Sequence, residues 1–461
     1  MDKYDAIIIG TGQGGTPLAK KLAKHGWKTA IIEKANPGGT CINTGCTPTK
    51  TLVASAKAAH TIANASAWGI EVKDYHIDIK KVLERKNKIV EQFRGGVRKG
   101  IAKTNNLTFI EGTAFFTANN TLSVKVKEGE AIEIFADKIF INTGASPSIP
   151  PIEGIDKTKY YTSASLMELE EIPQHLIIIG SGYIGLEFSQ LYKRLGSKVT
   201  LLEKGGRILK KEDEDVATEL EKILSAEGIV IEKNIRINRV EEKNNKVLVH
   251  CTRDNKPVII EGTHLLIAAG RKPCTEELHL DIAGVKVDDK GFIQTDEKLK
   301  TSVENIYALG DVKGGPQFTH VSYNDYLILY HNLVSGEERT IESRIVPYCI
   351  FMDPQLGRVG ITEQEAIEKN IPHKVAKIPG NYIARGLETG HTQGLMKAVV
   401  HAEDERVLGV AIIGEEGGEV MSILQMAMVG NIKWTQLREM IFAHPLYAES
   451  INNLFMQFDE V

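Results

Sequence analysis

Two cysteines separated by four residues, Cys41 and Cys46, are the residues of this chain best suited to chemistry. They lie in the run GGTCINTGCTPTK, from Gly38 to Lys50. Two thiols this close can form a reversible disulfide and exchange two electrons with a neighbouring redox group. A bare pair at this spacing is weak evidence of such activity, so the surrounding sequence decides the interpretation.

The residues around the pair predict that Cys46 begins a helix. Pro48 is tolerated in a first helical turn, and the alanine-rich run TLVASAKAAH follows it. A helix N-terminus stabilises a thiolate and lowers its pKa. Gly45 and Asn43 permit the bend that brings two sulfurs within bonding range. This pattern favours a reactive thiol pair.

A metal site is the competing interpretation of the cysteines. Zinc would require two further ligands at a suitable spacing. The remaining cysteines are scattered singly along the chain, at Cys251, Cys274 and Cys349. We therefore interpret those three as structural and expect no metal site.

A dinucleotide-binding fingerprint lies just upstream of the pair. Asp5 to Gly10 reads DAIIIG and predicts a buried strand, which leads into a G-x-G-x-x-G turn from Gly10 to Gly15. The glycines permit the tight turn and the close approach of a pyrophosphate. A helix over residues 17–24 would offer free N–H groups to phosphates. The next strand, Thr29 to Ile32, ends in Glu33, which could accept ribose hydroxyls.

The same fingerprint occurs a second time. Leu176 to Gly180 reads LIIIG and opens a second G-x-G-x-x-G turn that ends at Gly185. A strand over Lys198 to Leu202 then ends in Glu203. In both copies the acid follows the first glycine by 23 residues, from position 10 to 33 and from 180 to 203. The sequence therefore predicts two dinucleotide sites.

Composition agrees with a multidomain enzyme. The chain has 461 residues, 42% of them hydrophobic, and a formal net charge of −4. The length exceeds a single core, and the absence of a basic tract gives no reason to expect nucleic acid or an anionic membrane as a partner. No apolar run approaches the ~18 residues of a transmembrane helix, and the early first strand leaves no room for a signal peptide. With five cysteines, a reducing cytoplasmic location is expected.

Together these motifs resemble those of the class I pyridine nucleotide–disulfide oxidoreductases, the group of lipoamide dehydrogenase, glutathione reductase and mercuric reductase. Further segments carry the likeness, namely Thr143-Gly144-Ala145, Ala269-Gly270-Arg271, the run from Thr301 to Asp311, and HPLYAE from His444 to Glu449. The resemblance implies an α/β fold with two Rossmann-like domains and a C-terminal α+β dimerisation domain. It places FAD binding in residues 1–150 and 272–337, NAD(P) binding in residues 151–271, and the dimer interface in residues 338–461.

The resemblance also assigns catalytic roles. Cys46 would lie against the flavin as the charge-transfer thiolate, and Cys41 would attack the substrate. Lys50 and Glu187 match an ion pair beside the flavin N5. These assignments imply an NAD(P)H-dependent FAD disulfide oxidoreductase with a small-molecule substrate.

A histidine near the C-terminus completes the implied site. His444 would be the acid–base group, and Glu449 would orient its imidazole and favour the protonated form. In this family the histidine serves the cysteine pair of the other subunit. The resemblance therefore implies a homodimer.

The same resemblance implies which residues contact the cofactors. The residues implied to bind FAD are Gly10, Gly12, Gly15, Glu33, Gly39, Thr40, Lys50, Ala114, Gly144 and Asp311. Those implied to bind the nicotinamide nucleotide are Gly180, Gly182, Tyr183, Gly185, Glu203 and Gly270, with Tyr183 covering the nicotinamide pocket.

Glu203 bears on the choice of nucleotide. A carboxylate at this strand end accepts from a ribose 2′-hydroxyl and repels a 2′-phosphate. Lys204, Arg207 and Lys210 follow closely and would partly offset the repulsion. We predict NADH as the reductant, with NADPH as the alternative.

Comparison with the subgroups of this family bears on which electron acceptor the protein reduces. Mercuric reductases share the cysteine box and the PQLGRVG stretch, but they carry a C-terminal cysteine pair that delivers the metal, and no cysteine follows Cys349 here. Glu203 argues against glutathione reductase, and Thr47-Pro48-Thr49 departs from the usual Ile-Pro-Ser of lipoamide dehydrogenase. The segments CINTGCTPTKTLV and FTHVSYND resemble mercuric-reductase-like bacterial flavoproteins without delivery cysteines. Members of that group handle reactive chlorine species, hypothiocyanous acid or copper.

We therefore predict a stand-alone stress or detoxification reductase. One alternative is a lipoamide dehydrogenase that serves a 2-oxo acid dehydrogenase complex. The other is a non-enzymatic flavin redox sensor.

Overall fold

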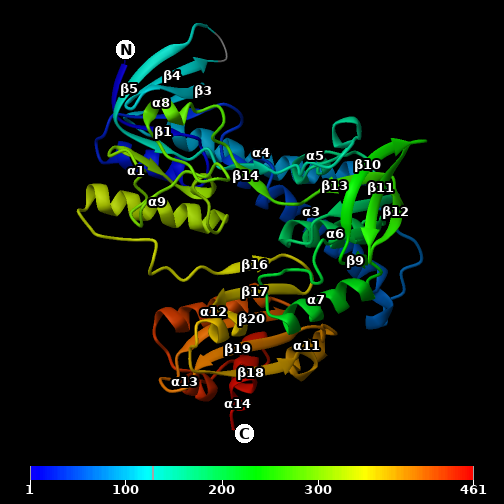
Figure 1. The fold of residues 1–461 in the computed structure, drawn as a ribbon. Helices are drawn as coiled ribbons and strands as arrows, with labels where there is room; N and C mark the ends of the chain where they lie inside the picture. The colour runs from blue at the N-terminus through cyan, green and yellow to red at the C-terminus, as the bar shows by residue number, and fades with distance from the viewer. Residues whose placement is uncertain (1, 127–128, 460–461) are drawn as a thin grey trace. The chain divides into compact units, whose positions relative to one another are not determined.

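The computed structural model describes residues 2–126 and 129–459 (Figure 1). It divides into two compact units, each assembled from three separate stretches of the chain. The first unit contains residues 1–51, 81–148 and 270–344, and the second contains residues 52–80, 149–269 and 345–461. Among the described residues, no helix has both the length and the apolar character needed to cross a bilayer.

The first unit is built on a sheet whose strands run largely parallel. Its six strands are β1 (Asp2–Ile9), β2 (Thr29–Glu33), β3 (Leu107–Ala118), β4 (Thr121–Val126), β5 (Ile132–Ile141) and β15 (Ile306–Ala308). β1 pairs in parallel with β2 on one side and with β5 on the other. β4 pairs in antiparallel orientation with both β3 and β5. The central position of the first strand places the glycine turn after it at the carboxyl edge of the sheet.

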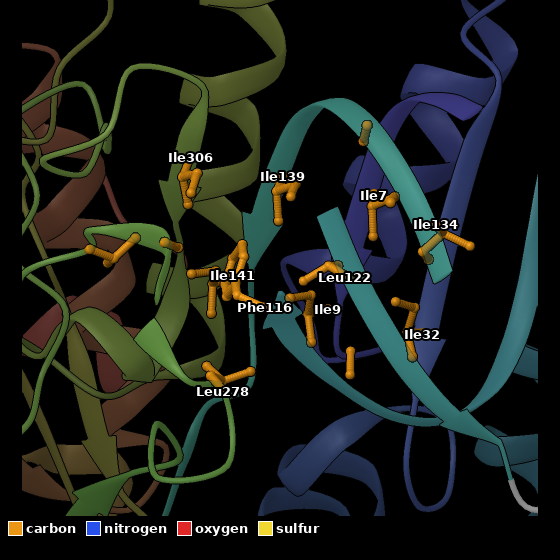
Figure 2. Packing of buried hydrophobic residues seen from close by; sticks show 14 of the residues in the cluster. Ile7, Ile9, Ile32, Phe116, Leu122, Ile134, Ile139, Ile141, Leu278 and Ile306 are labelled. Atoms are coloured by element: carbon orange, nitrogen blue, oxygen red, sulfur yellow. The ribbon is translucent and has the colours of Figure 1, made fainter. Parts of the chain in front are cut away.

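Both faces of this sheet are packed with apolar side chains. Figure 2 shows one face, where Ile7, Ile141 and Phe116 belong to a single buried cluster. On the other face Ile8 and Ile31 pack with Leu18 and Leu22. The helices of this unit are α1 (Gly15–Lys24), α2 (Gly39–Asn43), α4 (Ile79–Ala102), α8 (Leu280–Ala283) and α9 (Thr319–Val334). Burial on both faces explains why β1 ends in three consecutive isoleucines.

The second unit contains a smaller copy of the same arrangement. Its parallel strands are β7 (His175–Ile179), β8 (Lys198–Leu202), β9 (Val230–Glu232) and β13 (His264–Ile267), and β7 lies between β8 and β13. The helices that follow β7 and β8 are α6 (Tyr183–Arg194) and α7 (Glu214–Ala226). An antiparallel meander is inserted before β13, formed by β10 (Arg236–Lys243), β11 (Lys246–Arg253) and β12 (Lys256–Gly262).

The C-terminal part of the second unit is an antiparallel sheet covered by helices. In spatial order its strands are β16 (Tyr348–Ile350), β17 (Gln355–Gly360), β20 (Val407–Gly414), β19 (Leu395–His401) and β18 (His373–Pro379). Three helices share its core, namely α12 (Gly417–Val429), α13 (Trp434–Glu439) and α14 (Ser450–Met456). This is the α+β arrangement that the sequence analysis expects at the C-terminus.

The remaining helices, strands and 3-10 turns complete the two units. They are α3 (Cys46–Ala63), α5 (Ser163–Leu166), α10 (Glu363–Glu368), α11 (Ala384–Thr389), β6 (Ala145–Pro147), β14 (Arg271–Pro273), and the 3-10 turns η1 (Ala65–Trp68), η2 (Ile155–Lys157), η3 (Gly310–Lys313), η4 (Gly380–Tyr382) and η5 (Tyr447–Glu449). The strand predicted over Lys198 to Leu202 has these bounds in the structure. The helix predicted over residues 17–24 begins two residues earlier, at Gly15, because the last glycine of the turn is already helical.

Candidate active site

The two cysteines lie on consecutive helices. Cys41 is in the short helix α2, and Cys46 is the first residue of α3. Between them, a Cβ on Gly45 would lie 2.8 Å from the carbonyl oxygen of Thr40, so the chain bends there with no room for a side chain. The amide of Asn43 donates to the carbonyl oxygen of Gly39 at 2.9 Å and so closes the preceding turn. Neither of these two cysteines is disulfide-bonded in this structure.

Two helix N-termini meet at Cys46. Its Sγ lies 3.5 Å from Oγ1 of Thr319, which is the first residue of α9. The N-terminal ends of α3 and α9 both carry partial positive charge, which favours a thiolate at this position. The sequence analysis found the α3 contribution but assigned no role to Thr319.

The pKa of the Cys41 thiol favours the protonated form of that sulfur. The hydrogen bond between Cys41 and Cys46, burial, and the charge on Cys46 together hold the pKa of the Cys41 thiol far above its ordinary value. Thr319 and Lys50 oppose this effect without reversing it. In the reduced state Cys41 therefore keeps its proton, and the two helix N-termini favour the thiolate at Cys46. Cys41 needs a base before it can attack an electrophile.

The first glycine turn packs directly against the end of β5. Gly10 has φ of +105°, and a Cβ there would lie 2.4 Å from the carbonyl oxygen of Asn142. The side chain of Asn142 accepts from Gly15 N at 2.8 Å and donates to the carbonyl oxygen of Leu309 at 2.8 Å. Asn142 thus ties the turn to the segment that leads into Asp311. Sequence reasoning missed it, although it directly precedes the recognised Thr143-Gly144 step.

The carboxylate at the end of β2 stabilises the same turn. Glu33 accepts from the backbone N and the hydroxyl of Thr11, at 3.0 and 2.6 Å. Its other oxygen accepts from Ala35 N at 2.9 Å. Glu33 is therefore already oriented by the protein, and it keeps lone pairs that could accept the ribose hydroxyls that the sequence analysis assigns to it.

Asp311 lies in the turn η3 beside a buried cation. Its carboxylate is 3.7 Å from the guanidinium of Arg271, and burial raises the pKa of Asp311. Nε of Arg271 is buried and has no hydrogen-bond partner among the described residues. Nearby, Asp325 is fully buried and accepts from Gly310 N at 2.8 Å. This polar group is suited to hold a ribityl chain and its phosphates.

The second glycine turn repeats the first. Gly180 has φ of +107°, and a Cβ there would lie 2.5 Å from the carbonyl oxygen of Ala268, the counterpart of Asn142. Glu203 accepts from the hydroxyl of Ser181, as Glu33 does from Thr11. Burial would raise the pKa of Glu203, but Ser181, the Gly205 amide and Lys210 together lower it. Glu203 is thus ionised, with Nζ of Lys210 at 3.3 Å from its Oε1.

Several predicted glycines leave open space where a nucleotide would pass. A Cβ on Gly144, Gly182 or Gly270 would meet no protein atom within 4 Å. Protein packing therefore does not require glycine at these positions. The backbone favours glycine at Gly144 and Gly270, whose φ angles are +73° and +138°, and Gly182 leaves room for the close approach of a ligand. Gly12 and Gly39 instead contact each other, since a Cβ on Gly39 would lie 2.8 Å from the Gly12 Cα. The residues present fit FAD at the first turn and a nicotinamide nucleotide at the second.

The remaining predicted site residues lie on helices and strands of both units. Tyr183 opens α6, and Glu187 is buried on that helix, with its Oε1 accepting from Phe351 N at 2.9 Å. Ala114 is buried within β3, so it could offer a nucleotide only its backbone. Lys50 belongs to the first unit and Glu187 to the second, so the ion pair between them stays a prediction. Thr40 is in α2 beside Cys41.

The predicted acid–base pair is formed within one segment. Nδ1 of His444 lies 2.9 Å from Oε2 of Glu449, and the His444 side chain is 68% exposed. In the part of the chain that the structure describes, no group of three or more His, Cys, Asp or Glu side chains is arranged to hold a metal ion.

Comparison with known proteins identifies the class that this fold and site define. Residues 4–325 match the pyridine nucleotide-disulphide oxidoreductase family, and residues 346–455 match its dimerisation domain. The chain belongs to this family. It is therefore an oxidoreductase that uses FAD and NAD(P)H with a redox-active disulfide, and the dimerisation domain implies a homodimer.

Several individual relatives are similar to this chain over nearly its whole length. The pyridine nucleotide-disulfide oxidoreductase RclA of Escherichia coli K12 is 40% identical over 459 residues, covering 99% of each chain. A mercuric reductase of Lysinibacillus sphaericus is 34% identical over 459 residues, covering 100% of this chain and 83% of its own. A dihydrolipoyl dehydrogenase of Thermus scotoductus is 34% identical over 455 residues, covering 98% and 96%.

The solved structures agree. The HOCl-induced flavoprotein disulfide reductase RclA from Escherichia coli matches with a TM-score of 0.90 and 39% identity, over 98% of this chain and 99% of its own. Its Cu(II) complex matches with a TM-score of 0.91, over 99% and 100%. The predicted fold class, enzyme class and likeness to mercuric-reductase-like flavoproteins are confirmed.

Proposed function

We propose that this protein is an NADH-dependent stress reductase whose Cys41–Cys46 pair delivers two electrons to a small oxidant. The geometry of the cysteine pair carries the proposal, because Cys46 lies at two helix N-termini that favour a thiolate, while burial and the hydrogen bond to Cys46 keep Cys41 protonated. The description of the related RclA as HOCl-induced supports an oxidant from reactive-chlorine chemistry.

In the reductive half of the cycle, the protein residues would bind and orient FAD and the nicotinamide nucleotide. Bound FAD supplies the carrier that takes a hydride from the nicotinamide and passes an electron pair to the disulfide. Glu33 and the first glycine turn would hold its adenosine half, and Asp311 its ribityl chain. Tyr183, at the start of α6, would cover the nicotinamide. Glu203 would accept the 2′-hydroxyl of NADH and disfavour the phosphate of NADPH.

The oxidative half uses the thiols and the histidine. His444 of the partner subunit takes the proton from Cys41, which then attacks the electrophilic sulfur of an oxidant such as hypothiocyanous acid. A sulfur–sulfur bond forms, and the hydroxyl group leaves as water with the proton returned by the imidazole. The Cys46 thiolate attacks the Cys41 sulfur and expels thiocyanate, which closes the disulfide. NADH oxidation then restores the two electrons.

The test is NADH oxidation by the FAD-loaded dimer against five acceptors: lipoamide, oxidised glutathione, hypothiocyanous acid, Cu(II) and Hg(II). We expect fast turnover of hypothiocyanous acid, with lipoamide inert. Fast turnover of lipoamide alone would make the protein a dehydrogenase-complex component and overturn the proposal. Uniformly slow turnover would favour a flavin redox sensor.

Copper is a second candidate acceptor. The related RclA forms a Cu(II) complex, and thiolates are soft ligands that copper prefers once reduced. Two Cu(II) ions would take one electron each from the Cys41 thiol and Cys46 thiolate, giving two Cu(I) ions and the Cys41–Cys46 disulfide, and the Cys41 proton would pass to His444 of the partner subunit. Cu(I) formation that requires both NADH and Cys41 would support this activity. Equal Cu(I) formation by a Cys41→Ser variant would contradict it.

A further inference from the structure

The loop that follows Glu203 brings a lysine back to this carboxylate. The loop comprises residues 204–212, between β8 and α7 of the second unit. Nζ of Lys210 lies 3.3 Å from Oε1 of Glu203, and a Cβ on Gly205 would lie 2.5 Å from Cε of the lysine. The Lys210 side chain is 62% exposed. Because an exposed ion pair holds its side chains only weakly, the position of this ammonium depends on the backbone of the loop.

Hydrogen bonds within the loop join Lys210 to the start of α7. The amide of Glu212 donates to the carbonyl oxygen of Leu209 at 2.8 Å, and the guanidinium of Arg207 donates to that of Lys210 at 3.0 Å. Leu209 has φ of +44°, a left-handed conformation that a leucine keeps only while its surroundings hold it there. At the end of the loop the Glu212 carboxylate accepts from the hydroxyl of Tyr348 on β16. The turn is therefore held from the side of α7.

Asp213, the residue after this loop, is bound by the C-terminal part of the same unit. Its Oδ2 accepts from Glu363 N at 3.2 Å and its Oδ1 from Gln364 N at 3.1 Å, so it satisfies two N–H groups that the start of α10 leaves free. Oδ2 also lies 3.2 Å from Nζ of Lys397 on β19. The side chains of Asp213 and Lys397 are 5% and 2% exposed, so this is a buried and fixed end for the loop.

We propose that Asp213 is a positioning residue that sets the affinity of the nucleotide site for NADPH relative to NADH. By binding α10 and Lys397, it fixes the end of the loop and so keeps the Lys210 ammonium beside Glu203. There the ammonium offsets the repulsion between the carboxylate and a 2′-phosphate. The C-terminal sheet and its helix thus determine a property of a site that lies about 150 residues earlier in the chain. The inference rests on the proposed role of Glu203 in that site.

The experiment is calorimetric titration of the oxidised, FAD-loaded dimer with NAD+ and with NADP+, which requires no acceptor. Asp213→Ala should raise the Kd of NADP+ about fivefold, the effect expected of one exposed ion pair. The Kd of NAD+ should change little, because Ser181 still orients Glu203. Asp213→Asn keeps one oxygen that can accept from α10 and should restore part of the NADP+ affinity. A wild-type preference for NADP+ would overturn the NADH assignment, whereas an unchanged or equally shifted Kd for both nucleotides in Asp213→Ala would overturn the role of Asp213.

Two further variants separate positioning from general stability. In a Lys210→Ala background, Asp213→Ala should have no further effect on the Kd of NADP+. The matched control is Glu363→Gln, which removes another carboxylate from Lys397, at 2.6 Å, but keeps the backbone N–H that donates to Asp213. It should lower the unfolding temperature and leave the ratio of the two Kd values unchanged. Multiplicative losses of NADP+ affinity in the double variant, or the same change of ratio in Glu363→Gln, would overturn the proposal.

Discussion

Nδ1 of His444 is held by Glu449 at 2.9 Å, although the imidazole is largely exposed on its own subunit. The carboxylate fixes the ring through Nδ1, which leaves Nε2 as the nitrogen free to exchange protons. An exposed imidazole fixed in this way is what a site completed by a second subunit requires. The raised pKa of Cys41 supplies the reason that a base is needed at all.

Subunit complementation tests that arrangement. Cys41→Ser and His444→Ala should each lose turnover, but dimers that combine the two variants contain one site with Cys41 and the partner's His444 both intact. Random pairing should recover about a quarter of wild-type activity, because half the dimers are mixed and each has one complete site. Absence of recovery in purified mixed dimers would mean that histidine and cysteine belong to the same subunit.

Replacing the cysteines one at a time should separate their roles. Cys41→Ser should keep FAD and NADH binding and show the Cys46 thiolate absorbance without reduction, yet lose acceptor turnover by at least about a hundredfold. Cys46→Ser should lack that absorbance. Cys274→Ser, a half-buried thiol elsewhere, is the control and should behave as wild type. Retained turnover in Cys41→Ser would mean that the oxidant takes electrons directly from the flavin.

Glu203 should set the nucleotide preference. Glu203→Gln removes the charge that repels a 2′-phosphate and releases Lys210, so the ratio of kcat/KM for NADPH over NADH should rise about tenfold. Glu33→Gln changes the equivalent carboxylate of the first turn, so it should leave that ratio unchanged even where it weakens FAD binding. A wild-type preference for NADPH would show that the lysines and arginine after Glu203 decide instead.

Glu212 predicts a specific pH dependence of stability. Burial raises its pKa from 4.5 to about 6, although Arg358 opposes the shift. Because the folded protein binds this proton more tightly than the unfolded chain, the stabilisation is complete below pH 4.5 and is lost as the pH rises through about 6. The loss should be about 2 kcal/mol at most.

Urea unfolding at several pH values between 4.5 and 7 measures this effect. The free energy of unfolding of Glu212→Gln should lack the decline that wild type shows across that interval. Glu214→Gln, at the exposed neighbouring residue, should keep the wild-type profile. Parallel profiles for wild type and Glu212→Gln would contradict the prediction.

Local patterns predicted the repeated parts of this molecule well. Each glycine turn is fixed by a strand, a spacing and a terminal acid, all of which are short-range features, and the structure reproduces both copies. Asn142 and Thr319 were missed because their importance comes from partners far along the chain. Gly15 and Cys46 are separated from them by 127 and 273 residues, and no local pattern links such positions.

Because the glycine turn occurs twice, the same substitution can be compared at two equivalent positions of one chain. An added methyl group at Gly10 or at Gly180 would meet a backbone oxygen at nearly the same distance, 2.4 or 2.5 Å, with nearly the same backbone angle. The same alanine replacement therefore imposes equal strain in two places on one chain. A difference in stability between the Gly10→Ala and Gly180→Ala variants would therefore measure how much each bound nucleotide stabilises the domain that binds it.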